Sequence, residues 1–177
     1  MTKSRITVSV SWQGSPVTDH AEKLERINSA FVGFVPHNQA LGLDVTDFGP
    51  DMATMRLRYA SHLVGNPDTG VLHGGAITSL VDAACGAAVF MRLASPMPIA
   101  TLDLRIDYLR PADPGKDVYA RAECYRLTRN VAFVRALAYT DSVDDPVASA
   151  AATFMISTPG LSVMQRASQG SRSGGAE

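Results

Sequence analysis

The stretch AITSLVDAACGAAVFM, residues 76–91, decides the fold of this chain. Its residues are apolar or small on every side, and Asp82 is the single charged residue among them. The stretch is too long for a buried strand and shorter than the roughly 20 residues of a membrane span. It therefore predicts a helix that is enclosed by protein.

The sequence on both sides of this stretch alternates between apolar and polar residues, as strands do. A hairpin is predicted around Gly49-Pro50-Asp51, between Leu43 and Tyr59. Further strands are predicted at 101–108, 118–124, 131–140 and 147–156. Residues 131–140 are apolar on almost every side, which is typical of a central strand. The order predicts an α+β domain in which a curved antiparallel sheet wraps around one long buried helix.

The ends of the chain differ in composition from the middle. We expect residues 1–17 to be loosely ordered, residues 18–160 to form a single domain, and residues 161–177 to be a disordered tail. The tail is rich in Gly and Ser, so it buries too little apolar surface to offset its ordering entropy.

A helix is predicted near the start of the domain. Asp19-x-x-Glu22 has the pattern of a capping box. Pro36 is expected to end the helix. The apolar stripe of this helix consists of Leu24, Ile27, Phe31 and Phe34.

Charge and hydropathy exclude several functions. Sixteen Lys and Arg residues against seventeen Asp and Glu give a formal net charge of −1. Proteins that grip nucleic acid through its phosphates carry a basic excess or stripe, so no nucleic acid partner is expected. No apolar run approaches the length of a membrane span, and no run of signal-peptide length follows the first twelve residues. We expect a cytoplasmic protein without membrane association.

The cysteines and histidines indicate no metal centre. The chain contains neither HExxH nor a Cys/His cluster with ligand spacing, and no cofactor is expected. Cys85 and Cys124 could form one disulfide, but free buried thiols are the favoured interpretation in a reducing compartment.

Two features of the buried helix could carry chemistry. Burying a carboxylate costs several kcal/mol unless it is paired or hydrogen-bonded, and no cationic residue lies within two helical turns of Asp82. Asp82 is either a structural carboxylate at a solvent gap or subunit boundary, or a nucleophile or general base. At the helix start, His73-Gly74-Gly75 is either a plain glycine-rich loop or a source of backbone N–H donors for an oxyanion.

The spacing of these two features predicts an oligomer. Asp82 lies nine residues after His73, which places it roughly 10 Å from the first N–H groups of its own helix. If both features act on one substrate, they come from different protomers across a two-fold axis.

The pattern VLHGGAIxxLxDxxxGxA, residues 71–88, resembles the signature of hotdog-fold acyl-CoA thioesterases of the phenylacetate-pathway (PaaI) type. The resemblance extends from about Leu41 to Ile156. It implies a hotdog fold, hydrolysis of acyl-CoA, and a homodimer, often paired into a tetramer, whose active site lies across the dimer interface.

The resemblance also implies roles for individual residues. Asp82 matches the catalytic carboxylate, which either attacks the thioester carbonyl or activates water. Gly74 matches the residue whose backbone N–H polarises the carbonyl, with His73 beside it. Thr101 falls where some members have a Ser or Thr that helps to position the water, and Asn66 resembles a loop Asn that orients substrate or water.

Further residues are candidates for substrate binding. Gly75 allows a close approach to the backbone at the helix start. Arg129 and Asn130 occupy the turn where relatives often have a Gly-Arg pair, and the phosphates of coenzyme A need such cations.

Two other functions remain open at this point. The stretch beginning at His62 faintly resembles the loop of hotdog dehydratases and hydratases, but the acid of that family would fall near Ala76, where this chain has no carboxylate. A non-catalytic module that binds acyl-CoA or an aromatic ligand is the other alternative, because fold alone does not fix function.

Overall fold

The computed structural model describes residues 16–95 and 97–156. The helical elements are α1 (Pro16–Ile27), the π-helical turn η1 (Asn28–Val32), α2 (Pro36–Ala40), the short 3₁₀ helix η2 (Ser61–Leu63) and α3 (Gly74–Arg92). The strands are β1 (Leu43–Phe48), β2 (Met52–Leu57), β3 (Val64–Asn66), β4 (Val71–Leu72), β5 (Ile99–Tyr108), β6 (Val118–Leu127), β7 (Val131–Tyr139) and β8 (Ala148–Ile156).

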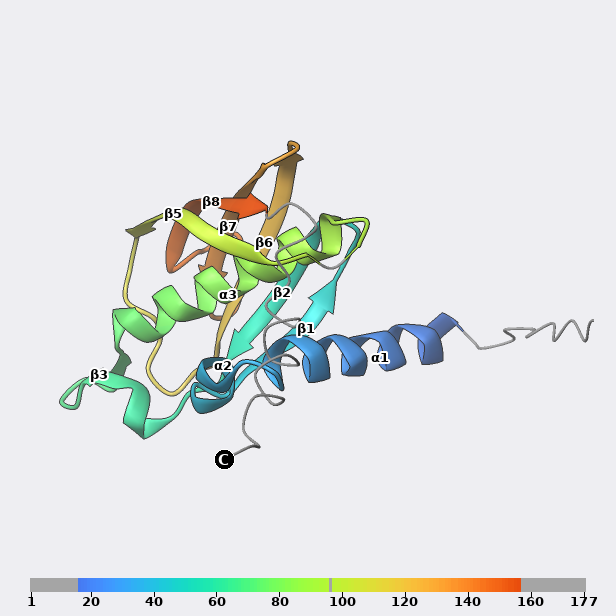
Figure 1. Ribbon diagram of the computed structural model, residues 1–177. Helices are drawn as coiled ribbons and strands as arrows, with labels where there is room; N and C mark the ends of the chain where they lie inside the picture. Colours follow the sequence, from blue (N-terminus) through green and yellow to red (C-terminus); the bar gives the residue numbers. More distant parts are fainter. Residues whose placement is uncertain (1–15, 96, 157–177) are drawn as a thin grey trace, which may run out of the picture.

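Six of these strands form one sheet in the order β1-β2-β6-β7-β8-β5, and every neighbouring pair is antiparallel. The helix α3 lies against the sheet, as Figure 1 shows. The predicted α+β architecture and the predicted hairpin of β1 and β2 are confirmed. The strand β7 lies inside the sheet, as its apolar pattern predicts. Residues 64–72, for which no strand is predicted, contain the small hairpin of β3 and β4.

Small residues bring α3 close to the sheet. On the helix, Ala84, Ala87 and Ala88 are no more than 1% exposed. Facing strands supply further fully or nearly fully buried alanines, namely Ala120, Ala122, Ala132 and Ala138. Close packing of this kind maximises dispersion contacts and excludes water.

The helix α3 has 19 residues, which is longer than the apolar stretch that predicts it. By length and composition, it is the one helix of the described chain that could cross a membrane. More than half of it is buried inside this domain. The core helix of a soluble protein passes the same test, so its length carries little weight as evidence for a membrane span.

The N-terminal helix departs from its predicted bounds. It begins at Pro16, not at the predicted capping box, and proline is well suited to the first helical position. After Ile27 the helix widens into the π-helical turn η1, which shifts the apolar stripe around the helix axis. Phe31 still packs against the core, whereas Phe34 is 73% exposed, so its predicted place on the buried stripe is wrong. Pro36 begins α2, a helix that the sequence did not predict.

Asn28 attaches this N-terminal region to the sheet. Its side-chain Nδ2 donates to the Val45 carbonyl at 2.8 Å, and its Oδ1 accepts from the Val45 N–H at 2.7 Å. The same Nδ2 lies 3.2 Å from the Leu24 carbonyl. The amide therefore supplies both backbone partners that edge strand β1 lacks at this residue.

The opposite edge strand, β5, carries a bulge at Leu102. Thr101 and Tyr108 are seven residues apart, so in a regular strand they would lie on opposite faces of the sheet. Because the bulge adds one residue, both side chains lie on the same face of the sheet. Both hydrogen-bond to residues of α3. The bulge also leaves Leu102 56% exposed at the sheet edge.

Both cysteines are free and buried, which confirms the favoured interpretation. Burial raises the pKa of the Cys85 thiol to about 12, and the negative charge of Asp82 contributes in the same direction. Burial also raises the pKa of Cys124. Both side chains are therefore protonated at neutral pH and are poor nucleophiles.

We expect Asn28→Ala to lower the free energy of unfolding by about 1–3 kcal/mol, because it leaves the buried N–H and carbonyl of Val45 without partners. Urea denaturation of the variant and the wild type measures this change. Ser29→Ala, at the exposed neighbouring position, is the control and should unfold as the wild type does. Equal stability of Asn28→Ala and the wild type would contradict the attachment.

Candidate active site

A cavity of about 450 Å³ lies beside α3 and is lined by residues of η1, α2, β5 and β8. One part of its lining is polar and comes from α2, the first half of α3 and β5: His37, Asn38, Thr78, Ser79, Asp82 and Thr101. The other part is apolar: Phe31, Val35, Phe90, Ile99 and Phe154. The volume is that of a typical small-molecule site. The polar–apolar division suits a ligand with a reactive head and a hydrophobic tail.

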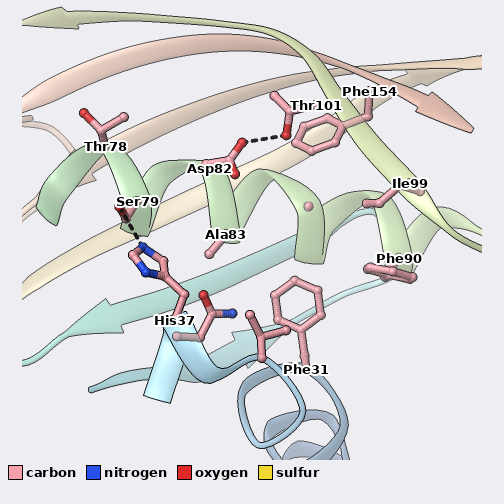
Figure 2. A pocket seen from close by; sticks show the side chains of 13 residues that line it. Phe31, His37, Thr78, Ser79, Asp82, Ala83, Phe90, Ile99, Thr101 and Phe154 are labelled. Atoms are coloured by element: carbon pink, nitrogen blue, oxygen red, sulfur yellow. Dashed lines mark hydrogen bonds between the residues drawn. The ribbon is translucent and has the colours of Figure 1, made fainter. Parts of the chain in front are cut away.

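Asp82 lies where the two parts meet. Residues four apart share a helix face, so Asp82, Gly86 and Phe90 form a row along the wall of the cavity. The Thr101 hydroxyl donates to Asp82 Oδ1 at 2.9 Å, as Figure 2 shows. Within residues 16–95 and 97–156 Asp82 forms no ion pair, so one carboxylate oxygen is open to the cavity.

The glycine turn at the start of α3 has one free donor. The Gly75 N–H donates to His73 Nδ1 at 2.9 Å, and the Ala76 N–H donates to the His73 carbonyl at 3.0 Å. His73 is thus the N-cap of α3. The Gly74 N–H has no partner in the described part of the chain. This N–H can donate a hydrogen bond to an anionic or carbonyl oxygen.

Tyr108 fixes this turn from β5. Its hydroxyl donates to the Gly74 carbonyl at 2.6 Å and lies 3.0 Å from Thr78 Oγ1, which also reaches that carbonyl. A Cβ at position 74 would come within 3.2 Å of the Tyr108 oxygen, so glycine suits this contact. Behind the turn, a Cβ on Gly65 would lie 2.8 Å from His73 Cα. Two glycines thus allow the turn to be packed from both sides.

In a single chain the glycine turn and Asp82 do not meet. Gly74 and Asp82 are eight residues apart on one helix, which corresponds to about 12 Å along its axis. His73 and Gly75 line a second cavity of about 380 Å³, which shares His37 and Ser79 with the first. Gly74 itself lines a third cavity of about 450 Å³, next to Tyr108. The free N–H of Gly74 and the carboxylate of Asp82 therefore lie in separate hollows of the described chain.

Comparison with known proteins identifies the family. Residues 69–146 match the family model described as thioesterase superfamily. The medium/long-chain acyl-CoA thioesterase YigI of Escherichia coli is 30% identical over 155 residues, which cover 80% of this chain and 99% of that protein. The chain belongs to the thioesterase superfamily. It is therefore a thioester hydrolase of the hotdog fold, and the resemblance to PaaI-type thioesterases is confirmed.

Solved structures agree with this assignment. A protein of Pseudomonas aeruginosa is 47% identical, with a TM-score of 0.68 over 75% of this chain and 97% of that chain. A variant of the phenylacetic acid degradation protein PaaI of Thermus thermophilus is 30% identical, with a TM-score of 0.60 over 68% of this chain and 98% of that chain.

The remaining predicted residues lie outside the first cavity of this thioesterase. Asn66 is exposed, and its side-chain Oδ1 accepts from the Asp68 N–H at 3.0 Å within the β3–β4 turn. Arg129 and Asn130 are exposed in the turn between β6 and β7. The Asn130 carbonyl accepts from the N–H of Ile156, which pairs with Ile99 at the start of β5.

Sequence reasoning missed three residues that line or support the candidate site. Tyr108 carries only the alternating strand pattern, which does not reveal its contact with Gly74. His37 and Asn38 follow Pro36, where no helix was predicted, and the proline at the first helical position was the available signal. Across the described chain, no group of three or more His, Cys, Asp or Glu residues could hold a metal ion.

We expect Thr101→Val to lower the rate of thioester hydrolysis about 10-fold or more, because it removes the one hydroxyl that orients Asp82. A hydrogen bond to a charged group contributes about 1.5–3 kcal/mol. Thr101→Ser keeps the hydroxyl and is the matched control, with a rate close to that of the wild type. Steady-state assays of free thiol measure both rates, and equal rates for Thr101→Val and the wild type would contradict the role of this bond.

Proposed function

We propose that this enzyme hydrolyses acyl-CoA thioesters to a free acid and coenzyme A. The observation that carries the proposal is Asp82, a carboxylate without an ion pair in the described chain that opens onto a half-apolar cavity. A cavity that only bound an acyl chain would gain little from such a charge, since its desolvation is costly. The likeness to the acyl-CoA thioesterase YigI supports the choice of substrate class.

Asp82 acts on the thioester carbonyl carbon in one of two ways. As a nucleophile it forms a mixed anhydride, which water then hydrolyses. As a general base it removes a proton from the attacking water. In both routes the carbon–sulfur bond breaks and coenzyme A leaves as its thiol. The Gly74 N–H stabilises the negative charge that develops on the carbonyl oxygen.

The separation of Gly74 from Asp82 requires a second copy of the chain. Edge strand β5 is hydrogen-bonded to β8 on one side only. Near one end of β5 Thr101 holds Asp82, and at the other end Tyr108 holds Gly74. Antiparallel pairing of two β5 strands places the Thr101 end of one beside the Tyr108 end of the other. The acid of one protomer then faces the glycine turn of its partner.

Charge selects the register of this pairing. A two-fold axis normal to the sheet sets one residue opposite its own copy. With Leu104 at the axis, Asp103 faces Arg105 of the partner subunit twice. With Arg105 at the axis, like charges face each other, which is destabilising. With Ile106 at the axis, opposite charges also pair, but only residues 104–108 overlap. The Leu104 register is therefore the one we propose for the homodimer, which can itself pair into a tetramer.

The acyl group is proposed to be a medium-length hydrocarbon chain. From Asp82 to Phe90 the cavity wall runs about 12 Å along the helix. Phe31 and Phe90 pack edge to face, with ring centroids 5.5 Å apart, in the apolar part of the cavity. Figure 2 shows these two rings farther along α3 than Asp82. The YigI relatives are named for medium and long chains, which agrees with a cavity of this size.

Coenzyme A is proposed to lie outside the acyl cavity. His73 and Gly75 line the adjoining hollow and are candidates for substrate binding there, and Arg129 and Asn130 are candidates for the phosphates and nucleotide of coenzyme A. Asn66 stays a candidate for orienting substrate or water in the assembled dimer. Two free buried thiols are consistent with a reducing compartment, and we propose that the enzyme acts in the cytoplasm.

We expect Asp82→Asn to lose at least about 10³-fold in kcat, because the amide can neither attack the carbonyl nor take a proton from water. The assay uses short, medium and aryl acyl-CoAs and traps the released thiol. Circular dichroism and gel filtration check that the variant remains folded and assembled. Wild-type turnover in Asp82→Asn would remove Asp82 from the mechanism, and binding without hydrolysis by the wild type would favour the binding-module alternative.

We expect Asp103→Arg and Arg105→Asp each to weaken the dimer, because each sets like charges opposite one another across the proposed axis. The double variant restores opposite pairs across the axis, although it loses the ion pair of Arg105 with Asp107 in its own strand. It should therefore recover dimer and activity relative to either single variant. Analytical ultracentrifugation and thiol release measure these two properties in parallel. A monomeric wild type, or a double variant no better than either single one, would contradict the proposed register.

A further inference from the structure

Asn38 is a buried polar residue for which the fold offers no partner. It lies on α2 and is 6% exposed, yet no hydrogen bond of its side-chain amide is found among the described residues. The same side chain lines the cavity that contains Asp82. The amide atoms of Asn38 are not among the fully buried unpaired atoms of the described chain, so they are open to the cavity. Their hydrogen-bond partner therefore comes from the cavity, either solvent or a ligand that displaces it.

The other polar side chains of this wall already have partners for their hydrogens. Thr101 donates to Asp82 at 2.9 Å. The hydroxyls of Thr78 and Ser79 donate to the carbonyls of Gly74 and Gly75, at 3.1 Å each. Because the Ser79 hydroxyl hydrogen is used in this way, the His37 ring is the donor in its 3.3 Å contact with Ser79. Among the described side chains of the cavity, Asn38 therefore has the free N–H groups.

The chemistry of the cavity indicates what these N–H groups bind. The thioester carbonyl must lie next to Asp82, at the junction of the polar and apolar parts. A carbonyl oxygen under attack gains negative charge and needs donors, not acceptors. Among the described side chains at this wall, the Asn38 amide supplies a donor from the same protomer as Asp82, whereas the Gly74 N–H of the proposed site comes from the partner.

We infer that Asn38 is a catalytic residue whose side-chain Nδ2 donates a hydrogen bond to the thioester carbonyl oxygen. The inference rests on the proposed hydrolysis of acyl-CoA. It divides the stabilisation of the oxyanion between the two subunits: a side-chain amide from the protomer that supplies the acid, and a backbone N–H from its partner. Asn38 thereby takes a role that the sequence pattern did not assign to it.

Asn38→Ala is expected to lower activity without lowering stability. Removing a donor to an oxyanion costs about 10²–10³-fold in kcat, and KM should change much less because the bond strengthens in the transition state. Removing an amide that lacks a protein partner should leave stability unchanged or raise it, since no hydrogen bond within the protein is lost. We therefore expect a loss of about 100-fold in kcat without a lower melting temperature.

Two further variants separate function from folding. Asn28→Ala removes an amide that is fully paired within the protein, so it should lower the melting temperature, whereas Asn38→Ala should not. Asn38→Asp keeps the size and the acceptor oxygen but lacks the N–H donor when ionised, so its kcat should fall at least as far as that of Asn38→Ala. This variant also carries the test if Asn38→Ala does not fold.

The outcomes distinguish this inference from the proposed function. Failure of the wild type to hydrolyse any acyl-CoA in the panel would refute the proposed function, and the role of Asn38 with it. An active wild type with an equally active Asn38→Ala would refute only the role of Asn38. A loss of kcat that follows a loss of melting temperature would make Asn38 structural. Activity retained in Asn38→Asp but lost in Asn38→Ala would show that an acceptor, not a donor, is needed.

Discussion

The whole arrangement depends on keeping one carboxylate on a helix that is apolar and mostly buried inside the domain. Asp82 is held by a single hydroxyl, that of Thr101, while Val81, Ala84 and Cys85 beside it on α3 are fully buried. A cation at this place would have stabilised the charge, but it would also have consumed the reactivity of the carboxylate. The fold instead leaves the carboxylate without an ion pair in the described chain and accessible through a cavity.

Edge strand β5 connects this carboxylate to the rest of the proposed mechanism. It holds Asp82 through Thr101 and the glycine turn through Tyr108, and it carries the unpaired edge at which we propose that two chains meet. An exposed edge is a hazard for a soluble protein unless something covers it. In the proposed dimer the edge is covered, and the same pairing brings the acid and the backbone donor together. Assembly and catalysis would then depend on one strand.

The N-terminal elements complete the site in a different way. The π-helical turn η1 turns Phe31 toward the cavity and leaves Phe34 exposed, and α2 places His37 and Asn38 at the polar wall. Asn28 fastens these elements to β1 through a fully paired amide. Asn38, ten residues later, has no partner in the described chain. The paired amide of Asn28 therefore stabilises the fold, whereas the unpaired amide of Asn38 is available to a ligand in the cavity.

The amino-acid sequence by itself determined the buried helix, the flanking antiparallel strands and the place of Asp82 and His73-Gly74-Gly75 on that helix. These are local properties, set by hydropathy period and by distance along one helix. Only the tertiary structure showed that Thr101 and Tyr108 both face α3. The one-residue bulge between them exchanges the two faces of the strand for every later residue, and the alternating sequence pattern does not reveal a bulge. It also decided that Asn38 and not Asn66 lines the cavity with Asp82. Which of two asparagines is left without a partner depends on contacts between elements distant in the chain, and a residue pattern does not record them.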